Sequence, residues 1–138
     1  MGEREKNPYT VKFNQELWDN QVLKENKELY RDFINYCKSV DRSPETIKNY
    51  ESTLRCLFCY MCEDFNNKSF IKITKRDIMN MQNYWLNERG MSSSRIRFVK
   101  STMSSLSNFI ENILDEDYPD FRNIINKIPA PTLNKVMK

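Results

Sequence analysis

The chain has 138 residues, 39% of them hydrophobic and 30% charged, a composition typical of one folded domain and not of a disordered segment. It contains no histidine, which excludes catalytic triads, metal sites and general bases that need a histidine. Its two glycines are too few for a phosphate-cradling loop. No apolar run approaches the ~20 residues of a membrane span, and the polar N-terminus lacks a signal-peptide core. We therefore expect a cytoplasmic protein with reduced cysteines and no contact with a membrane.

The first half of the chain predicts a flexible arm and two helices. Residues 1–14 form the polar arm, and apolar residues at helical spacing predict a helix over 15–39 that a break near Asn20 could divide. A second helix is predicted from Pro44 to Asp64, because Ser43 can cap it and proline suits its first position. Its apolar stripe has three- and four-residue spacing and comprises Ile47, Tyr50, Leu54, Leu57 and Met61.

The second half predicts two further main helices. Thr74 and Asp77 form an approximate capping box at the start of the third helix, which should end at Gly90. Serines 92–94 can cap the fourth helix, whose apolar stripe continues to about Asp117. A short fifth helix is possible over 120–126. The sequence thus predicts an all-α bundle of four main helices with a possible short fifth helix, forming one domain over 15–128 with a linker over 129–138.

Short motifs along the chain also follow a characteristic order. They are Ser43-Pro44-x-Thr46-Ile47-x-x-Tyr50, Ile73-Thr74-x-x-Asp77-Ile78, Gly90-x-Ser92-x-x-x-Ile96 and Ile128-Pro129. Their order and spacing resemble the SAM-like core-binding domain of tyrosine recombinases, the phage-integrase class, over residues 29–131. The resemblance implies a bacterial or phage-encoded protein that binds double-stranded DNA at the crossover site of recombination. It also implies contacts with other recombinase protomers in a synaptic complex when the protein is full length.

Candidate DNA contacts lie off the apolar stripes of the second and fourth helices. The resemblance places Thr46, Asn49, Lys100 and Ser101 at positions that approach DNA in the family. Arginine, lysine and small polar side chains suit contacts with phosphates and with some base edges. The residues that share these faces by helical spacing are Lys48, Ser52 and Arg55 on the second helix, and Ser93, Ser94, Arg97 and Ser104 on the fourth.

The distribution of charge along the chain also favours DNA as the partner. The net charge is only +3, but residues 68–100 carry eight basic side chains against two acidic ones, followed by an acidic stretch. A chain polarised in this way can present a basic face to an anionic partner. Lys75 and Arg76, at the start of the third helix, are further phosphate candidates. An ordinary solvated surface, or a helical adaptor whose basic face binds an acidic protein partner, remains an alternative interpretation of the same charges.

The chemistry of the resembled family is not expected in this chain. Tyrosine recombinases cleave DNA with a tyrosine nucleophile assisted by arginines and histidines of a separate catalytic domain. This chain has no histidine and only seven residues after Pro131, and Tyr50 falls on an apolar stripe. We therefore assign no catalytic residue and no cofactor, and we expect a monomeric fragment of a recombinase that is not itself an enzyme.

Three closely spaced cysteines, Cys56-x-x-Cys59-x-x-Cys62, are similar in spacing to part of an iron–sulfur ligand run. They fall within the strongest helical pattern, where steps of three residues spread the thiols around the helix, and Cys37 is distant in sequence. Buried or half-buried thiols are therefore favoured over a metal site.

Overall fold

The computed structural model describes residues 13–133, in which every regular element is helical and no strand occurs. This confirms the predicted all-α class. The described residues fall into two compact units, an N-terminal unit of residues 13–73 and a C-terminal unit of residues 74–133. Among them, no helix is both long and apolar enough to cross a bilayer.

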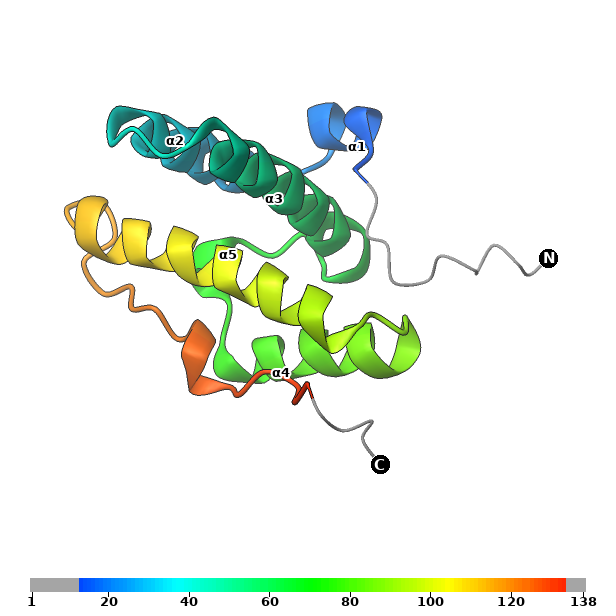
Figure 1. Cartoon of the computed structure of the whole chain (residues 1–138). Helices are drawn as coiled ribbons and strands as arrows, with labels where there is room; N and C mark the ends of the chain where they lie inside the picture. The colour runs from blue at the N-terminus through cyan, green and yellow to red at the C-terminus, as the bar shows by residue number, and fades with distance from the viewer. Residues whose placement is uncertain (1–12, 134–138) are drawn as a thin grey trace. The chain divides into compact units, whose positions relative to one another are not determined.

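The N-terminal unit contains three α-helices, α1 (Gln15–Asn20), α2 (Lys24–Ser39) and α3 (Pro44–Asp64). Helices α2 and α3 pack side by side, and α1 contacts α3 (Figure 1). The break expected near Asn20 is confirmed, since the chain leaves the helix there and re-enters it at Lys24. Leu29, Phe33, Leu54 and Phe58 are among the buried side chains that form the core of this unit.

Local capping fixes both ends of α3. The Ser43 hydroxyl accepts a hydrogen bond of 3.1 Å from the Thr46 amide, and Pro44 occupies the first turn, as the sequence predicts. At the other end, Asn66 and Asn67 adopt left-handed backbone angles (φ 57° and 53°) that asparagine tolerates well. The Asn67 side chain also accepts from the Leu23 amide at 3.0 Å, which ties the end of α3 to the start of α2.

A buried asparagine anchors the segment that follows α3. Asn26 on α2 is fully buried, and its amide nitrogen donates to the Lys68 carbonyl at 3.0 Å. Its side-chain oxygen accepts from the Phe70 amide at 2.8 Å, where the 3-10 turn η2 (Phe70–Lys72) begins. Because both polar ends of Asn26 are paired, the buried amide carries no unsatisfied group. Asn26 therefore holds residues 68–70 against α2 through neutral hydrogen bonds.

The C-terminal unit contains α4 (Lys75–Asn83), the π-helical turn η3 (Tyr84–Glu88), α5 (Ser93–Ile113) and the 3-10 turn η4 (Ile125–Lys127). The capping box at Thr74 and Asp77 is complete, with hydrogen bonds of 3.0 and 3.1 Å between side chains and backbone amides. Gly90 ends this stretch in the left-handed region (φ 69°), as expected. The fourth-helix cap is Ser92, whose hydroxyl accepts from the Arg95 amide.

The structure of this unit differs from the sequence-based expectation at two places. Helix α5 ends at Ile113 instead of near Asp117, and a turn closes with the Tyr118 amide donating to the Leu114 carbonyl. Residues 115–117 are all acidic, which opposes helix extension because the C-terminal end of a helix carries partial negative charge.

The helix predicted over 120–126 is also absent, and only η4 forms there. The Asn123 side chain caps the Ile125 amide at 2.9 Å, and the Asn123 amide donates to Glu111 at 2.8 Å. These partners replace the hydrogen bonds that a helix would supply. Ile125 is 2% exposed and anchors the returning chain in the core of the unit.

Candidate nucleic-acid interface

The α5 polar face consists of Ser94, Arg97, Lys100, Ser101 and Ser104, which lie off the apolar stripe of the helix. Ser94, Arg97 and Ser101 are exposed, and their spacing of three and four residues places them in one row. Ser104 is half-buried. The prediction that these residues share one face is consistent with their exposure, whereas Lys100 is in a different environment.

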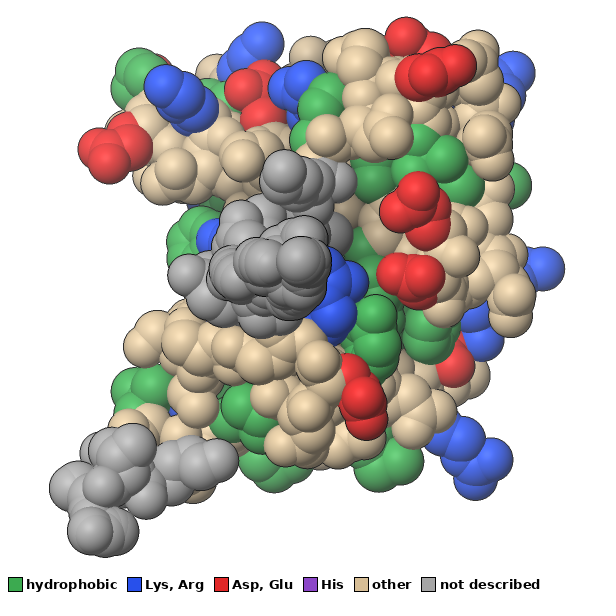
Figure 2. Space-filling model, turned by 90° about the vertical axis from the view of Figure 1, so that its right-hand side faces the viewer, with side chains coloured by type: hydrophobic (Ala, Val, Ile, Leu, Met, Phe, Trp, Pro, Cys, Tyr) green, Lys and Arg blue, Asp and Glu red, His purple; other side chains and the backbone are tan. Residues whose placement is uncertain are grey.

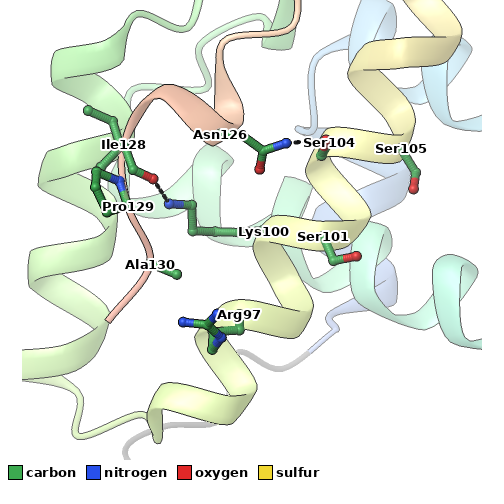
Figure 3. A pocket seen from close by; sticks show the side chains of 9 residues that line it. All are labelled: Arg97, Lys100, Ser101, Ser104, Ser105, Asn126, Ile128, Pro129 and Ala130. Atoms are coloured by element: carbon green, nitrogen blue, oxygen red, sulfur yellow. Dashed lines mark hydrogen bonds between the residues drawn. The ribbon is translucent and has the colours of Figure 1, made fainter. Parts of the chain in front are cut away.

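Lys100 is only 4% exposed, although its side chain is cationic. Its ammonium group donates to the backbone carbonyl of Ile128, which lies on the chain returning from η4 (Figure 3). Burial lowers the pKa of Lys100 below its usual value, and the positive charge of Arg97 lowers it further. The ammonium therefore acts here as an internal hydrogen-bond donor.

Two other side chains hold the same returning chain. The Arg97 guanidinium donates to the Pro131 carbonyl at 2.9 Å, and the Gln82 amide of α4 donates to the Pro129 carbonyl at 2.8 Å. We call residues 128–131 the docked segment. A cleft of about 370 Å³ lies between this segment and α5 (Figure 3). Its lining comprises Arg97, Lys100, Ser101, Ser104, Ser105, Asn126, Ile128, Pro129 and Ala130.

The Ser104 hydroxyl accepts hydrogen bonds from two asparagines of the returning chain. The side-chain amide of Asn123 donates to the Ser104 hydroxyl at 2.9 Å and also to Asn108 at 2.9 Å. The amide of Asn126 donates to the same hydroxyl at 3.3 Å (Figure 3). The hydroxyl of Ser104 is thus an acceptor within the unit, while Ser101, one helical turn earlier, is exposed.

The cations of α5 have no acidic partner among residues 13–133. Arg97 and Lys100 form no ion pair there, and the first half of α5 contains arginine and lysine but no aspartate or glutamate. Arg95, on another side of the helix, lies 5.8 Å from the ring centroid of Phe98. The α5 polar face therefore keeps its positive charge, which is the property that attracts a phosphate.

The α3 polar face comprises Lys48, Asn49, Ser52 and Arg55. The first three are exposed, whereas Arg55 is half-buried with its guanidinium 4.3 Å from the ring centroid of Phe13. Lys48, Ser52 and Arg55, together with Phe13 and Glu51, line a cleft of about 340 Å³. Glu51 supplies a negative charge on this cleft, so the positive charge on α3 is partly offset.

The remaining predicted contacts are at helix starts. The Thr46 hydroxyl is half-buried and accepts from the Ser43 hydroxyl at 2.8 Å, so it belongs to the α3 cap. Ser93 is half-buried in the first turn of α5. Lys75 and Arg76 are exposed in the first turn of α4. Contact of each predicted residue with DNA stays a prediction.

Charge on the visible surface is mixed. Figure 2 shows both basic and acidic side chains on the face that it presents. Within the C-terminal unit, the α5 polar face is the clearest basic surface, because no aspartate or glutamate lines its cleft.

Sequence reasoning did not identify Gln82, Asn123 and Asn126, which hold the returning chain. Neutral amides on a helix or in a loop give no local signal, and their partners are 47, 19 and 22 residues away in the sequence. Only the folded backbone brings them together.

The four cysteines form no disulfide, and the described residues contain no group of three or more histidine, cysteine, aspartate or glutamate side chains that could hold a metal. Cys37 and Cys59 are buried, and burial raises the pKa of both thiols. The Cys59 thiol donates to the Asn14 carbonyl at 3.7 Å. These cysteines therefore behave as small core side chains.

The chain matches the family model described as phage integrase, N-terminal SAM-like domain, over residues 29–120. The chain belongs to this family. The match covers both units, from α2 through α5 to the turn that follows, and it confirms the resemblance read from the sequence motifs. The chain is accordingly an integrase-type SAM-like domain.

A curated relative supports the same assignment. The SPbeta prophage-derived recombinase-like protein YomM of Bacillus subtilis is 39% identical over 117 residues. The alignment covers 83% of this chain and 34% of the relative, so the chain spans about a third of that protein's length. No solved structure matches the chain significantly.

Proposed function

We propose that this integrase-family domain binds double-stranded DNA at the crossover site of a site-specific tyrosine recombinase. The observation that supports the proposal best is the α5 polar face, where exposed Arg97 stands between the hydroxyls of Ser94 and Ser101 with no acidic partner among the described residues. A cation flanked by small hydroxyl groups can contact a phosphate directly and leaves room for the duplex to approach.

The α3 polar face gives secondary support. Lys48 is exposed and can contact a phosphate, and Asn49 carries an amide that can pair with a base edge. Arg55 is already engaged by Phe13 and the cleft contains Glu51, so we expect α3 to contribute less affinity than α5. In this proposal DNA cleavage takes place in a part of the parent recombinase that the present chain does not include.

The test is binding of the chain to mixed-sequence duplex DNA, titrated from low to physiological salt. We expect affinity to fall steeply with salt, because each neutralised phosphate releases counterions. Arg97→Ala should weaken binding by about tenfold and reduce the slope of the logarithmic salt plot by about one.

Arg95→Ala is the matched control, because it removes the same charge from the same helix on another side. Net charge falls equally in both variants, so a specific contact predicts a larger loss for Arg97→Ala. Equal losses would indicate a diffuse electrostatic effect, and no binding at low salt by the unmodified chain would contradict the proposal. The adaptor alternative would then be examined with an acidic helical peptide.

A further inference from the structure

Three side chains recognise the docked segment through its carbonyl groups. Gln82 of α4 and Arg97 and Lys100 of α5 donate to the carbonyls of Pro129, Pro131 and Ile128 respectively. These donors belong to helices, whereas the segment follows η4 and has no helical hydrogen bonds of its own. The segment is therefore held from one side, by contacts that can break without unfolding α4 or α5.

The electrostatics of this contact are poorly matched. A backbone carbonyl presents only a partial negative charge, while Arg97 and Lys100 present two full positive charges close to one another. Lys100 is 96% withdrawn from solvent, being 4% exposed, and no carboxylate among the described residues compensates it. A phosphate oxygen would be a stronger partner for both cations than a carbonyl, because hydrogen bonds between charged groups are stronger than those to neutral ones.

We propose that a phosphate group can displace the docked segment from the Arg97 and Lys100 side chains. Docking of the segment and binding of a phosphate group at the α5 polar face then exclude one another. This rests on the proposed function for the source of the phosphate, which is the backbone of duplex DNA. The segment then acts as an internal competitor that lowers affinity for DNA until it is released. Its release would free the chain beyond Pro131 at the moment when DNA binds.

Gln82→Ala tests the competition without altering either cation. The substitution removes the anchor on the Pro129 carbonyl, so the docked state is weakened and duplex binding should tighten by about two- to fivefold, the equivalent of one hydrogen bond. Asn80→Ala is the control, since Asn80 is exposed on the same helix. Asn126→Ala loosens the returning chain at a second point, on Ser104, and should act in the same direction as Gln82→Ala.

The state of the segment is followed separately by the amide NMR signals of Ile128 and Ala130 in the full chain. Saturating duplex should move both signals toward the positions of an unstructured peptide, and inorganic phosphate should do so at higher concentration. If the duplex binds while these signals stay unchanged and Gln82→Ala leaves affinity unaltered, the competition is refuted and the DNA-binding proposal stands.

Failure of DNA binding gives a different pattern. If no duplex binds to the unmodified chain or to Gln82→Ala, the proposed function is wrong, and the phosphate titration then decides the inference alone. Displacement of the segment by inorganic phosphate, made easier by Gln82→Ala, supports a phosphate site whose ligand is not duplex DNA. An unchanged segment at saturating phosphate overturns the inference.

Discussion

Each unit holds a segment that follows a helix, but the two do so with different chemistry. In the N-terminal unit, neutral Asn26 pairs both of its polar ends with residues 68–70 in a dry interior. In the C-terminal unit, the cations Arg97 and Lys100 hold the docked segment through neutral carbonyls. Asn26, which we call the neutral anchor, leaves no charge to satisfy. Arg97 and Lys100, which we call the cationic anchor, carry two charges that prefer an anion. Arg97 and Lys100 therefore differ from Asn26 in that an anion would be a stronger partner for them than the carbonyls they now hold.

The largest effect should follow from breaking the neutral anchor. Asn26→Ala leaves the buried Phe70 amide without its acceptor, so the free energy of unfolding should fall by about 2 to 3 kcal/mol. Urea denaturation measures the change, with Asn35→Ala as the control because Asn35 is exposed on the same helix. A loss no larger than that of the control would mean that residues 68–70 do not depend on Asn26.

Removing a charge from the cationic anchor should instead raise the free energy of unfolding. Lys100→Met keeps an unbranched side chain only one atom shorter and removes its buried charge, so the free energy of unfolding at pH 7 should rise by about 1 kcal/mol. The carbonyl of Ile128 is half-buried and can bind water when the ammonium is absent, which limits the loss from the missing hydrogen bond. A fall of several kcal/mol would instead identify Lys100 as a permanent structural contact like Asn26.

The difference in stability between Lys100→Met and the unmodified chain should depend on pH, which provides a further test of the buried charge. The pKa of Lys100 is lowered in the folded chain, so near and below the ordinary value of 10.5 the unfolded state binds more protons than the folded state. The contribution of Lys100 to the free energy of unfolding of the unmodified chain therefore rises with pH in that window. The advantage of Lys100→Met should shrink as pH increases toward 10.5, since the variant has no group titrating there. An advantage that stays constant across this window would show that Lys100 remains as easily protonated as a solvated lysine.

The smallest effect concerns a second contact that holds residues 68–70 against α2. The buried Ser69 hydroxyl donates to Glu25 of α2 at 2.6 Å. Ser69→Ala should lower the free energy of unfolding by about 1 kcal/mol, less than for a fully buried charge, because Glu25 is half-buried and water can replace the hydroxyl. Ser52→Ala, on the exposed face of α3, should have little effect when both are measured by urea denaturation. Equal values for the two variants would leave Asn26 as the main anchor of this segment.

The sequence predicted those features that depend on neighbouring residues. The caps at Ser43 and Thr74 and the left-handed Gly90 were identified correctly, and Ser92 is one of the three serines expected to cap the fourth helix, because each feature involves partners within three or four positions. The apolar spacing of the main helices was equally local, and it gave the all-α class and the family.

The features that sequence reasoning missed depend on distant contacts. Lys100 has the helical position of a surface cation, and its burial arises from a segment 28 residues further along the chain. Residues 120–126 have an acceptable helical pattern, but Asn123 finds acceptors on α5 and the helix does not form. Neither outcome is visible in a window of local sequence.

The two prolines of the docked segment have a consequence for how this chain behaves when the segment is released. Pro129 and Pro131 have no backbone N–H, so between Pro129 and Pro131 only Ala130 can donate from the main chain. A strand ladder needs donors along the strand, and proline removes them. An exposed segment of this kind cannot act as the edge onto which a second copy adds a β-strand. Release of this segment, as proposed above, would therefore not create a template for aggregation.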